Sequence, residues 1–134
     1  MTAKKTSHNH YGMPVYETSE GEFAIGTEAQ ANKAAREYIL DSLWAFNSSF
    51  IGKFAKLSAS ETKAVETMQR EMSEGANPLI RRIIGEKNLD YFVREAIRAD
   101  GRGHFLSPYD GREETSDRID DTGLPKGRLA YRIN

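Results

Sequence analysis

The spacing of apolar residues along this chain changes from two to three-or-four and back again. Near the start, Val15, Phe23 and Ile25 alternate with polar or small residues on either side of a Gly-containing turn. A period of two on both sides of such a turn is typical of a β-hairpin. The pattern therefore predicts a hairpin over residues 13–26.

Helices are predicted in the middle of the chain, where polar capping residues precede the apolar stripes. Thr27 with Gln30, and Ser58 with Glu61, have the spacing of capping boxes, in which each side chain bonds the backbone amide of the other residue. Apolar residues then recur at helical spacings of three and four. About four helices result, over residues 28–46, 59–74, 79–84 and 88–100, with Asn77 and Asn88 as the caps of the last two and no assignment for 47–57.

The alternation returns near the C-terminus. Residues 103–109 read as a strand that ends at the Asp110-Gly111 turn, and residues 129–133 read as a last strand that pairs with it. Between them, residues 111–127 form a long polar loop whose isolated apolar residues are Ile119 and Leu124. We expect an α+β fold, with about four helices packed with a small antiparallel sheet from N-terminal and C-terminal hairpins.

The domain plan has two parts. Residues 1–12 contain almost nothing to bury and are predicted to be a flexible tail. Residues 13–134 are predicted to form one domain, because 134 residues is an ordinary size for a single core.

Composition and charge restrict the function classes without selecting one. The chain has no cysteine, which excludes disulfides, thiolate metal sites and cysteine nucleophiles and fits a reducing cytosol. No run of 18 apolar residues is present, so we expect neither a membrane partner nor secretion, but a cytoplasmic protein. Nineteen basic and twenty acidic residues give a formal charge of −1, which indicates no particular partner.

Candidate chemistry in the sequence is sparse. His104, with Asp100, Ser107 and Asp110 nearby, resembles acid–base or nucleophilic equipment, but the same residues are common at a surface turn. The sequence around Arg102, flanked by two glycines, could bind a phosphate or simply end a helix. His8 and His10 are too few to hold a metal ion. We therefore expect no metal, no cofactor and no catalytic residue.

Residues for partner binding are easier to nominate. Aromatic side chains anchor protein interfaces when they remain exposed, and adjacent arginines form a small basic patch. The candidate set is Trp44, Phe50, Arg81, Arg82, Arg102, His104 and Tyr109.

Several stretches of the chain resemble small uncharacterised bacteriophage proteins, and the likeness spans most of the sequence. They are Glu22-Phe23-Ala24-Ile25-Gly26-Thr27, Trp44-Ala45-Phe46-Asn47, Gly75-Ala76-Asn77-Pro78-Leu79, Asp100-Gly101-Arg102-Gly103-His104-Phe105-Leu106 and Tyr131-Arg132-Ile133-Asn134. The resemblance implies expression in an infected bacterium, where proteins of this size often bind and redirect or inhibit a host machine, including defence systems.

Three functions remain open from the sequence. The first is a phage-encoded, non-catalytic inhibitor or modulator that masks a surface of a host protein, such as a defence nuclease complex. The second is a nucleic-acid-binding accessory protein that uses the lysines of the N-terminal tail with Arg81, Arg82, Arg98 and Arg102. The third is a small hydrolase or nucleotide-ligand-binding protein centred on His104. A homodimer stays open in each case.

Overall fold

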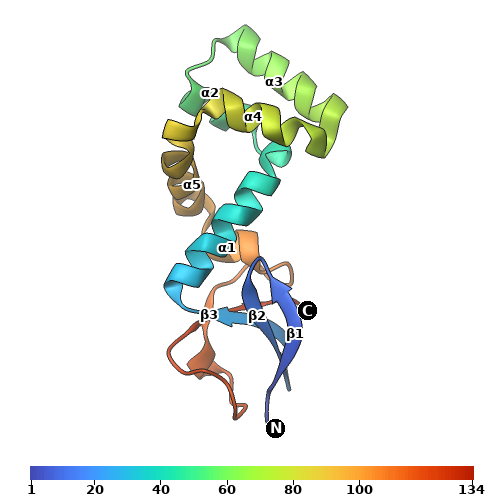
Figure 1. Ribbon diagram of the computed structural model, residues 1–134, viewed down its shortest axis with the longest axis vertical. Coiled ribbons are helices and arrows are strands. Elements are labelled where there is room, and N and C mark those ends of the chain that lie inside the picture. Colours follow the sequence, from blue (N-terminus) through green and yellow to red (C-terminus); the bar gives the residue numbers. More distant parts are fainter. The chain divides into compact units, whose positions relative to one another are not determined.

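The computed structural model describes all 134 residues, which divide into two compact units where the sequence predicted one domain. The sheet unit combines Met1–Tyr38 with Ala99–Asn134, and the helical unit is Ile39–Arg98. The division falls inside two helices, α1 (Glu28–Asp41) and α5 (Glu86–Asp100). Strands lie toward both ends of the chain and helices lie between them, which confirms the predicted α+β class (Figure 1).

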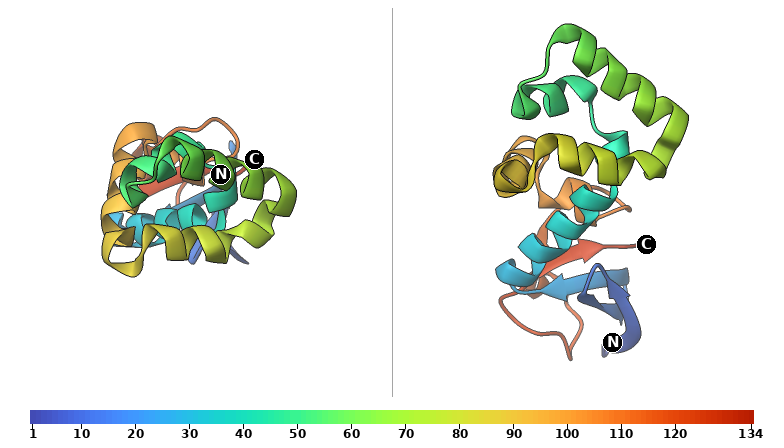
Figure 2. Two further views of the ribbon diagram at one scale, coloured as in Figure 1. Left: turned by 90° about the horizontal axis from the view of Figure 1, so that it is seen from above. Right: turned by 45° about the horizontal axis from the view of Figure 1, so that its top comes forward.

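The sheet unit contains a five-stranded antiparallel sheet in the order β1-β2-β3-β5-β4. The predicted hairpin is confirmed as β2 and β3, and β5, from the other end of the chain, lies beside β3 (Figure 2). The strands are β1 (Lys4–His10), β2 (Met13–Thr18), β3 (Gly21–Gly26), β4 (Glu114–Thr115) and β5 (Leu129–Arg132).

The predicted flexible tail is instead strand β1, which pairs with β2 from Lys4 opposite Glu17 to His10 opposite Met13. A two-residue turn joins the strands, and both of its residues, Tyr11 and Gly12, have positive φ (52° and 86°). Such turns match the right-handed twist of paired strands, and glycine adopts them without strain. Backbone pairing therefore orders a segment whose side chains are mostly exposed.

The predictions of a strand over 103–109, and of its pairing with the last strand, are wrong. Residues Arg102–Leu106 form the short helix α6, and β5 pairs with β3 and β4. Phe105 and Leu106 are neighbours in sequence and both are buried, which a half-buried strand does not allow because its side chains alternate. The segment still reaches β5, since Ser107 Oγ donates to the carbonyl of Arg132 over 2.9 Å.

The polar loop covers one face of the sheet. Phe23 and Ile25 on β3, with Ala130 on β5, form a buried cluster with Ile119, and Leu124 packs against it. The loop also contains β4 and a turn of 3₁₀ helix, η3 (Ser116–Arg118). The isolated apolar residues of the loop are therefore its anchors, because each removes apolar surface of both loop and sheet from water.

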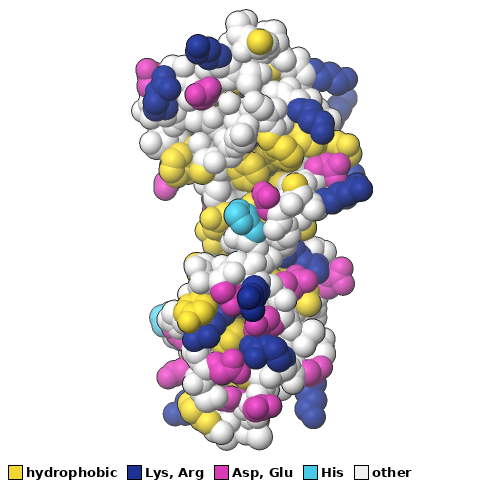
Figure 3. All heavy atoms as spheres, turned by 180° about the vertical axis from the view of Figure 1, so that it is seen from behind, with side chains coloured by type: hydrophobic (Ala, Val, Ile, Leu, Met, Phe, Trp, Pro, Cys, Tyr) yellow, Lys and Arg dark blue, Asp and Glu magenta, His cyan; other side chains and the backbone are white.

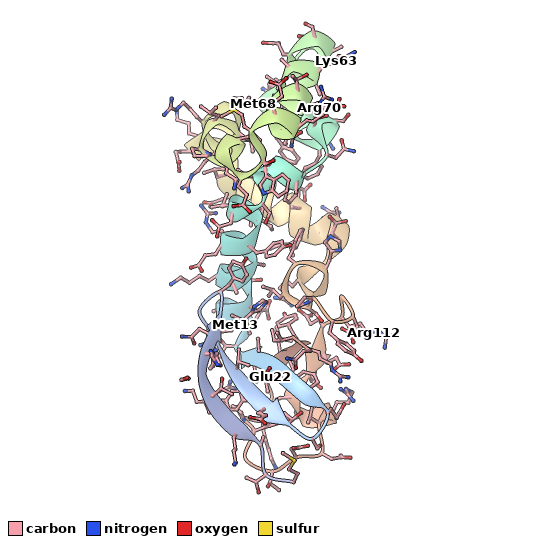
Figure 4. All side chains as sticks on the ribbon, turned by 90° about the vertical axis from the view of Figure 1, so that its right-hand side faces the viewer. Met13, Glu22, Lys63, Met68, Arg70 and Arg112 are labelled. Carbon is pink, nitrogen blue, oxygen red and sulfur yellow. The ribbon has the colours of Figure 1, made fainter.

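Because side chains alternate along a strand, Ala24 of β3 points to the other face of the sheet. It pairs with Tyr131 on β5, and both side chains are fully buried. Met13, labelled on β2 in Figure 4, is also fully buried, whereas Glu22, labelled on β3, lies at the hairpin end of its strand. Gly26 lies close to this core, since a Cβ there would be 3.0 Å from Met13 Cε.

The helical unit begins with the end of α1. The Ser58–Glu61 capping box is confirmed, and so is the box of Thr27 with Gln30 at the start of α1. The elements that follow α1 are η1 (Leu43–Ala45), α2 (Ser48–Ala55), α3 (Ala59–Met72), η2 (Ser73–Ala76), α4 (Asn77–Ile84) and α5.

Two predicted caps have other roles. The Asn77 side chain donates to the carbonyl of Asp41 (2.6 Å) and accepts from the amide of Trp44 (2.8 Å). These bonds lie at the end of α1, which stops at Asp41 and not at Phe46 as predicted. Asn88 lies inside α5 and donates to the carbonyl of Ile84 over 3.2 Å. Both side chains satisfy backbone groups at helix ends, which otherwise lack partners.

The space-filling view shows one face of the molecule. On that face the broadest hydrophobic patch lies on the helical unit, and acidic and basic side chains are interspersed on both units (Figure 3). None of the helices has the length and apolar character needed to cross a bilayer.

Candidate binding sites

A pocket of about 600 Å³ lies in the sheet unit, within the polar loop. Its size falls in the range of small-ligand sites, about 300–1,000 Å³. We call it the loop pocket. Its lining is Ser116, Asp117, Ile119, Asp120, Asp121, Thr122, Gly123, Leu124, Pro125 and Lys126.

Hydrogen bonds hold the two ends of this loop together. The Ser116 amide donates to the carbonyl of Arg128 over 2.8 Å, and the Arg128 amide donates to Ser116 Oγ over 3.1 Å. The amide of Gly127 donates to Asp117 Oδ1 over 3.0 Å. These bonds fix the backbone on both sides of the loop pocket, so the lining is preorganised.

The N-terminus holds the middle of the loop. Ala3 donates its amide to the carbonyl of Thr122 (2.8 Å), and Thr122 donates its amide to the carbonyl of Met1 (3.1 Å). Asp121 accepts from the amide and the hydroxyl of Ser19, and these bonds hold the pKa of Asp121 below its ordinary value. Residues predicted to be a flexible tail therefore help to form the loop pocket.

The lining combines an apolar floor with carboxylates. Ile119 is buried, and Leu124 packs on the same core cluster. Of the three aspartates, Asp121 is engaged by Ser19 and Asp117 by Gly127, while Asp120 is exposed and has no hydrogen bond or ion pair. No group of three or more metal-ligating side chains that could hold an ion is present. The chemistry suits an organic cation with an apolar stem.

Arg102 lies in a different arrangement, an ion pair inside the sheet unit. Its guanidinium donates Nε and Nη2 to the two carboxylate oxygens of Glu113 over 2.7 and 3.2 Å, and Nη1 to Asn32 over 3.0 Å. The buried Tyr131 donates its hydroxyl to Glu113 as well. Bidentate pairs of this kind fix geometry. Arg102 therefore joins α6 to α1 and to Glu113, which in turn links it to Tyr131 on β5. All three guanidinium nitrogens already have partners within the sheet unit.

The pKa values in this cluster follow from its burial and bonding. Burial alone would raise the pKa of Glu113, but the hydrogen bonds from Arg102 and Tyr131 outweigh it and hold this pKa below its ordinary value of 4.5. Burial, and then the bond to Glu113, raise the pKa of the Tyr131 hydroxyl. A carboxylate with a lowered pKa stabilises the fold above its unfolded pKa, and that contribution is lost as the pH falls through the folded pKa.

Replacing Arg102 with methionine is expected to lower the free energy of unfolding by about 1–2 kcal/mol near pH 7, after allowance for partial exposure. The difference from wild type should shrink as the pH falls below 4.5, the ordinary value for a glutamate, and then through the lowered pKa of Glu113. Urea titrations near pH 7 and at successively lower pH values measure this change. Arg81→Met is the matched control, because the Arg81–Glu86 pair is exposed and should contribute less than about 0.5 kcal/mol. A loss of unfolding free energy that stays the same at all of these pH values would contradict the assignment of the effect to the Arg102–Glu113 ion pair.

His104 and Ser107 do not form the arrangement of a base beside a nucleophile. Ser107 is buried, and its hydroxyl lies 2.8 Å from Asp110 Oδ1 and 2.9 Å from the carbonyl of Arg132. The exposed His104 ring packs edge-on against Phe105 at 5.0 Å and bonds neither Ser107 nor Asp110. These contacts describe a turn that follows α6.

The remaining candidates of the sheet unit have packing roles. Tyr109 is 55% exposed, and the Arg132 guanidinium lies 3.8 Å from its ring centre. His10 bonds the carbonyl of Leu106 over 2.8 Å, and burial lowers its pKa in spite of that bond. His8 is exposed on β1.

Four candidates lie in the helical unit. Trp44 is half-buried in η1. Phe50 is half-buried on α2, with ring centres 4.9 Å from Phe54 and 5.1 Å from Phe92. Arg81 pairs with Glu86 over 3.0 Å, whereas Arg82 is exposed without a partner. Arg82 is thus the one arginine of this predicted pair that a partner could bind without breaking an ion pair.

Comparisons with protein-family models, with curated proteins and with solved structures returned no match.

Sequence reasoning missed the loop pocket, although one signal was present. The signal is the presence of two isolated apolar residues, Ile119 and Leu124, in an otherwise polar segment. Both pack against the core cluster of the sheet. The Asp121 contact to Ser19 joins residues 102 positions apart, which no local pattern reveals.

Proposed function

We propose that this chain is a non-catalytic binding protein that masks a surface of a partner protein by taking a basic side chain of that partner into the loop pocket. The observation that carries the proposal is the preorganised pocket itself, with the unengaged Asp120 carboxylate beside an apolar floor. The resemblance to small bacteriophage proteins supports a partner from an infected bacterium.

The chemistry of lysine and arginine matches this lining. Both side chains bury an aliphatic stem along apolar surface and keep the charged end at a carboxylate. Asp120 is free to accept from such a group, and Asp117 has a second oxygen beyond the one bonded to Gly127. The net charge of the lining is −2, from three aspartates and one lysine. A basic surface of the partner would therefore be attracted to it.

Nucleases suit this description as partners. Proteins that act on nucleic acid contact phosphates with lysine and arginine. When another protein covers those side chains, they can no longer bind the substrate. Masking of this kind needs no chemistry in the masking protein. A host defence nuclease complex is the partner class that this proposal favours.

The experiment is capture of host proteins by full-length wild type and by Asp120→Arg, with quantitative mass spectrometry of the bound fraction. The variant is expected to lose a stoichiometric partner by at least about tenfold, because the reversed charge meets a basic group. Glu37→Arg makes the same charge change at an exposed position of α1 and should retain the partner. Equal capture by all three proteins, or no stoichiometric partner with wild type, would refute the proposal.

A further inference from the structure

One face of α5 carries a basic and aromatic stripe. Lys87, Tyr91, Arg94 and Arg98 follow one another at spacings of four, three and four, and all four are exposed. Such spacings place side chains on one face of a helix. The opposite face is buried and consists of Leu89, Phe92, Val93 and Ala96. We call the exposed face the α5 stripe.

The charges on the α5 stripe are all positive. Arg98 lies 3.9 Å from Glu95, at the limit of an ion pair, and its side chain remains 82% exposed. Lys87 and Arg94 have no ion-pair partner. Two acidic residues of α5 flank the stripe, the exposed Asp90 on one side and the half-buried Glu95 on the other, so the positive charge is confined to the stripe itself. It complements an anionic partner.

An aromatic surface lies among these cations. Tyr91 is 49% exposed, its ring centre lies 5.2 Å from that of Phe54 on α2, and the Arg94 guanidinium lies 5.5 Å from the Tyr91 ring centre. Lys53 lies 5.9 Å from the ring centre of Phe54. The contact with Phe54 restricts the positions open to the Tyr91 ring before a ligand arrives.

We infer that the α5 stripe binds single-stranded nucleic acid, with phosphates on its cations and a base stacked on Tyr91. Alternating cations and exposed aromatic rings are the two elements by which proteins bind single strands without sequence preference. A duplex would use only the cations, because its bases are stacked on one another. An acidic protein would likewise leave the Tyr91 ring without a stacking partner.

The size of the α5 stripe sets the strength of binding. Lys87 and Arg98 are eleven positions apart, about 16 Å along the helix axis, which limits the contacts to a few phosphates. Three cations predict a slope of log K against log salt of roughly −2 for a single strand. Binding is therefore weak and strongly reduced by salt. This inference uses residues of the helical unit and does not depend on the proposed function of the loop pocket.

The test is fluorescence anisotropy of a labelled oligothymidylate with the full-length chain, between about 50 and about 200 mM salt. Wild type is expected to bind with the slope given above. Tyr91→Ala should weaken binding about tenfold and Tyr91→Phe should retain it, since a phenyl ring also stacks. Arg94→Glu should weaken binding more than tenfold.

Matched controls separate a site from general charge attraction. Lys63→Glu and Arg70→Glu change exposed cations on α3, labelled in Figure 4, and should leave binding unchanged. Asp120→Arg, which tests the loop pocket, should not weaken oligonucleotide binding. Circular dichroism of each variant checks that the helices are retained.

Several results would overturn the inference. They are no salt-dependent binding by wild type, an equal loss with Lys63→Glu, equal affinity for a duplex of the same length, or tighter binding to polyglutamate than to oligothymidylate. The last result would assign the α5 stripe to an acidic protein.

Discussion

Phe92→Ala is expected to lower the free energy of unfolding of the helical unit by about 3–5 kcal/mol. The side chain is fully buried, and its ring centre lies 5.4 Å from Phe46, 5.1 Å from Phe50 and 5.3 Å from Phe54. Truncation removes the ring at the centre of this group, and the cavity that remains cannot close fully. Urea unfolding followed by fluorescence of Trp44, the only tryptophan, measures the effect in this unit.

The neighbouring residue provides the control. Tyr91→Phe retains the contact with Phe54 and changes an exposed group, so its effect should stay within about 0.5 kcal/mol. A loss below about 1 kcal/mol for Phe92→Ala would show that the aromatic group is not the core of the helical unit.

Gly103→Ala is expected to destabilise the sheet unit by about 1–3 kcal/mol or more. A Cβ at Gly103 would lie 2.6 Å from the carbonyl carbon of Arg112, 2.6 Å from the oxygen of Gly111 and 2.7 Å from the amide nitrogen of Glu113. These are backbone atoms, so the new methyl group can be accommodated only if residues 111–113 shift. The shift would displace the Glu113 carboxylate from Arg102. Urea unfolding measures the loss of stability, and the NMR chemical shift of the Glu113 amide reports the displacement of residues 111–113.

Gly75→Ala is the matched substitution in the helical unit. A Cβ there would lie 3.9 Å from Met72 Cβ, an ordinary contact, and the backbone is helical. Alanine lowers the entropy of the unfolded chain, so a change between zero and about 1 kcal/mol of added stability is expected. Equal stabilities for Gly103→Ala and wild type would contradict the close approach of α6 to residues 111–113.

Local signals in the sequence predicted the elements that depend on neighbouring residues. Ser58 and Glu61, and Thr27 and Gln30, are three positions apart and cap their helices as expected, because a capping box needs no distant partner. The hairpin of β2 and β3 was likewise recognisable from Phe23 and Ile25.

Elements that depend on distant pairing were missed. Strand β1 buries none of its seven side chains fully, so its sequence lacks the alternation that identifies a strand, and its order comes from hydrogen bonds to β2. Helix α6 has five residues, too few for a period of 3.6 to be distinguished from a period of two. One of the two partners of β5 is β3, more than one hundred residues earlier, and no local pattern encodes that choice.

The candidate sites divide in the same way. Exposed single residues such as Arg82 and Tyr109 could be nominated from their type, and both are exposed. The loop pocket could not, because it requires residues 116–126 to meet the N-terminus and Ser19. The spacings of four, three and four in the α5 stripe are visible in the sequence, but the near-neutral charge of the whole chain gives no sign of a local positive surface.

Hydrogen exchange measured by NMR tests most directly the claim that the polar loop and the N-terminal residues form one ordered pocket. The amides of Ala3, Ser116 and Thr122 each donate to a backbone carbonyl, so their exchange should be slowed well below the rate of an unstructured peptide. Exchange of all three amides at the rate of an unstructured peptide would show that these hydrogen bonds are not formed, and the loop pocket would then not exist as an ordered site.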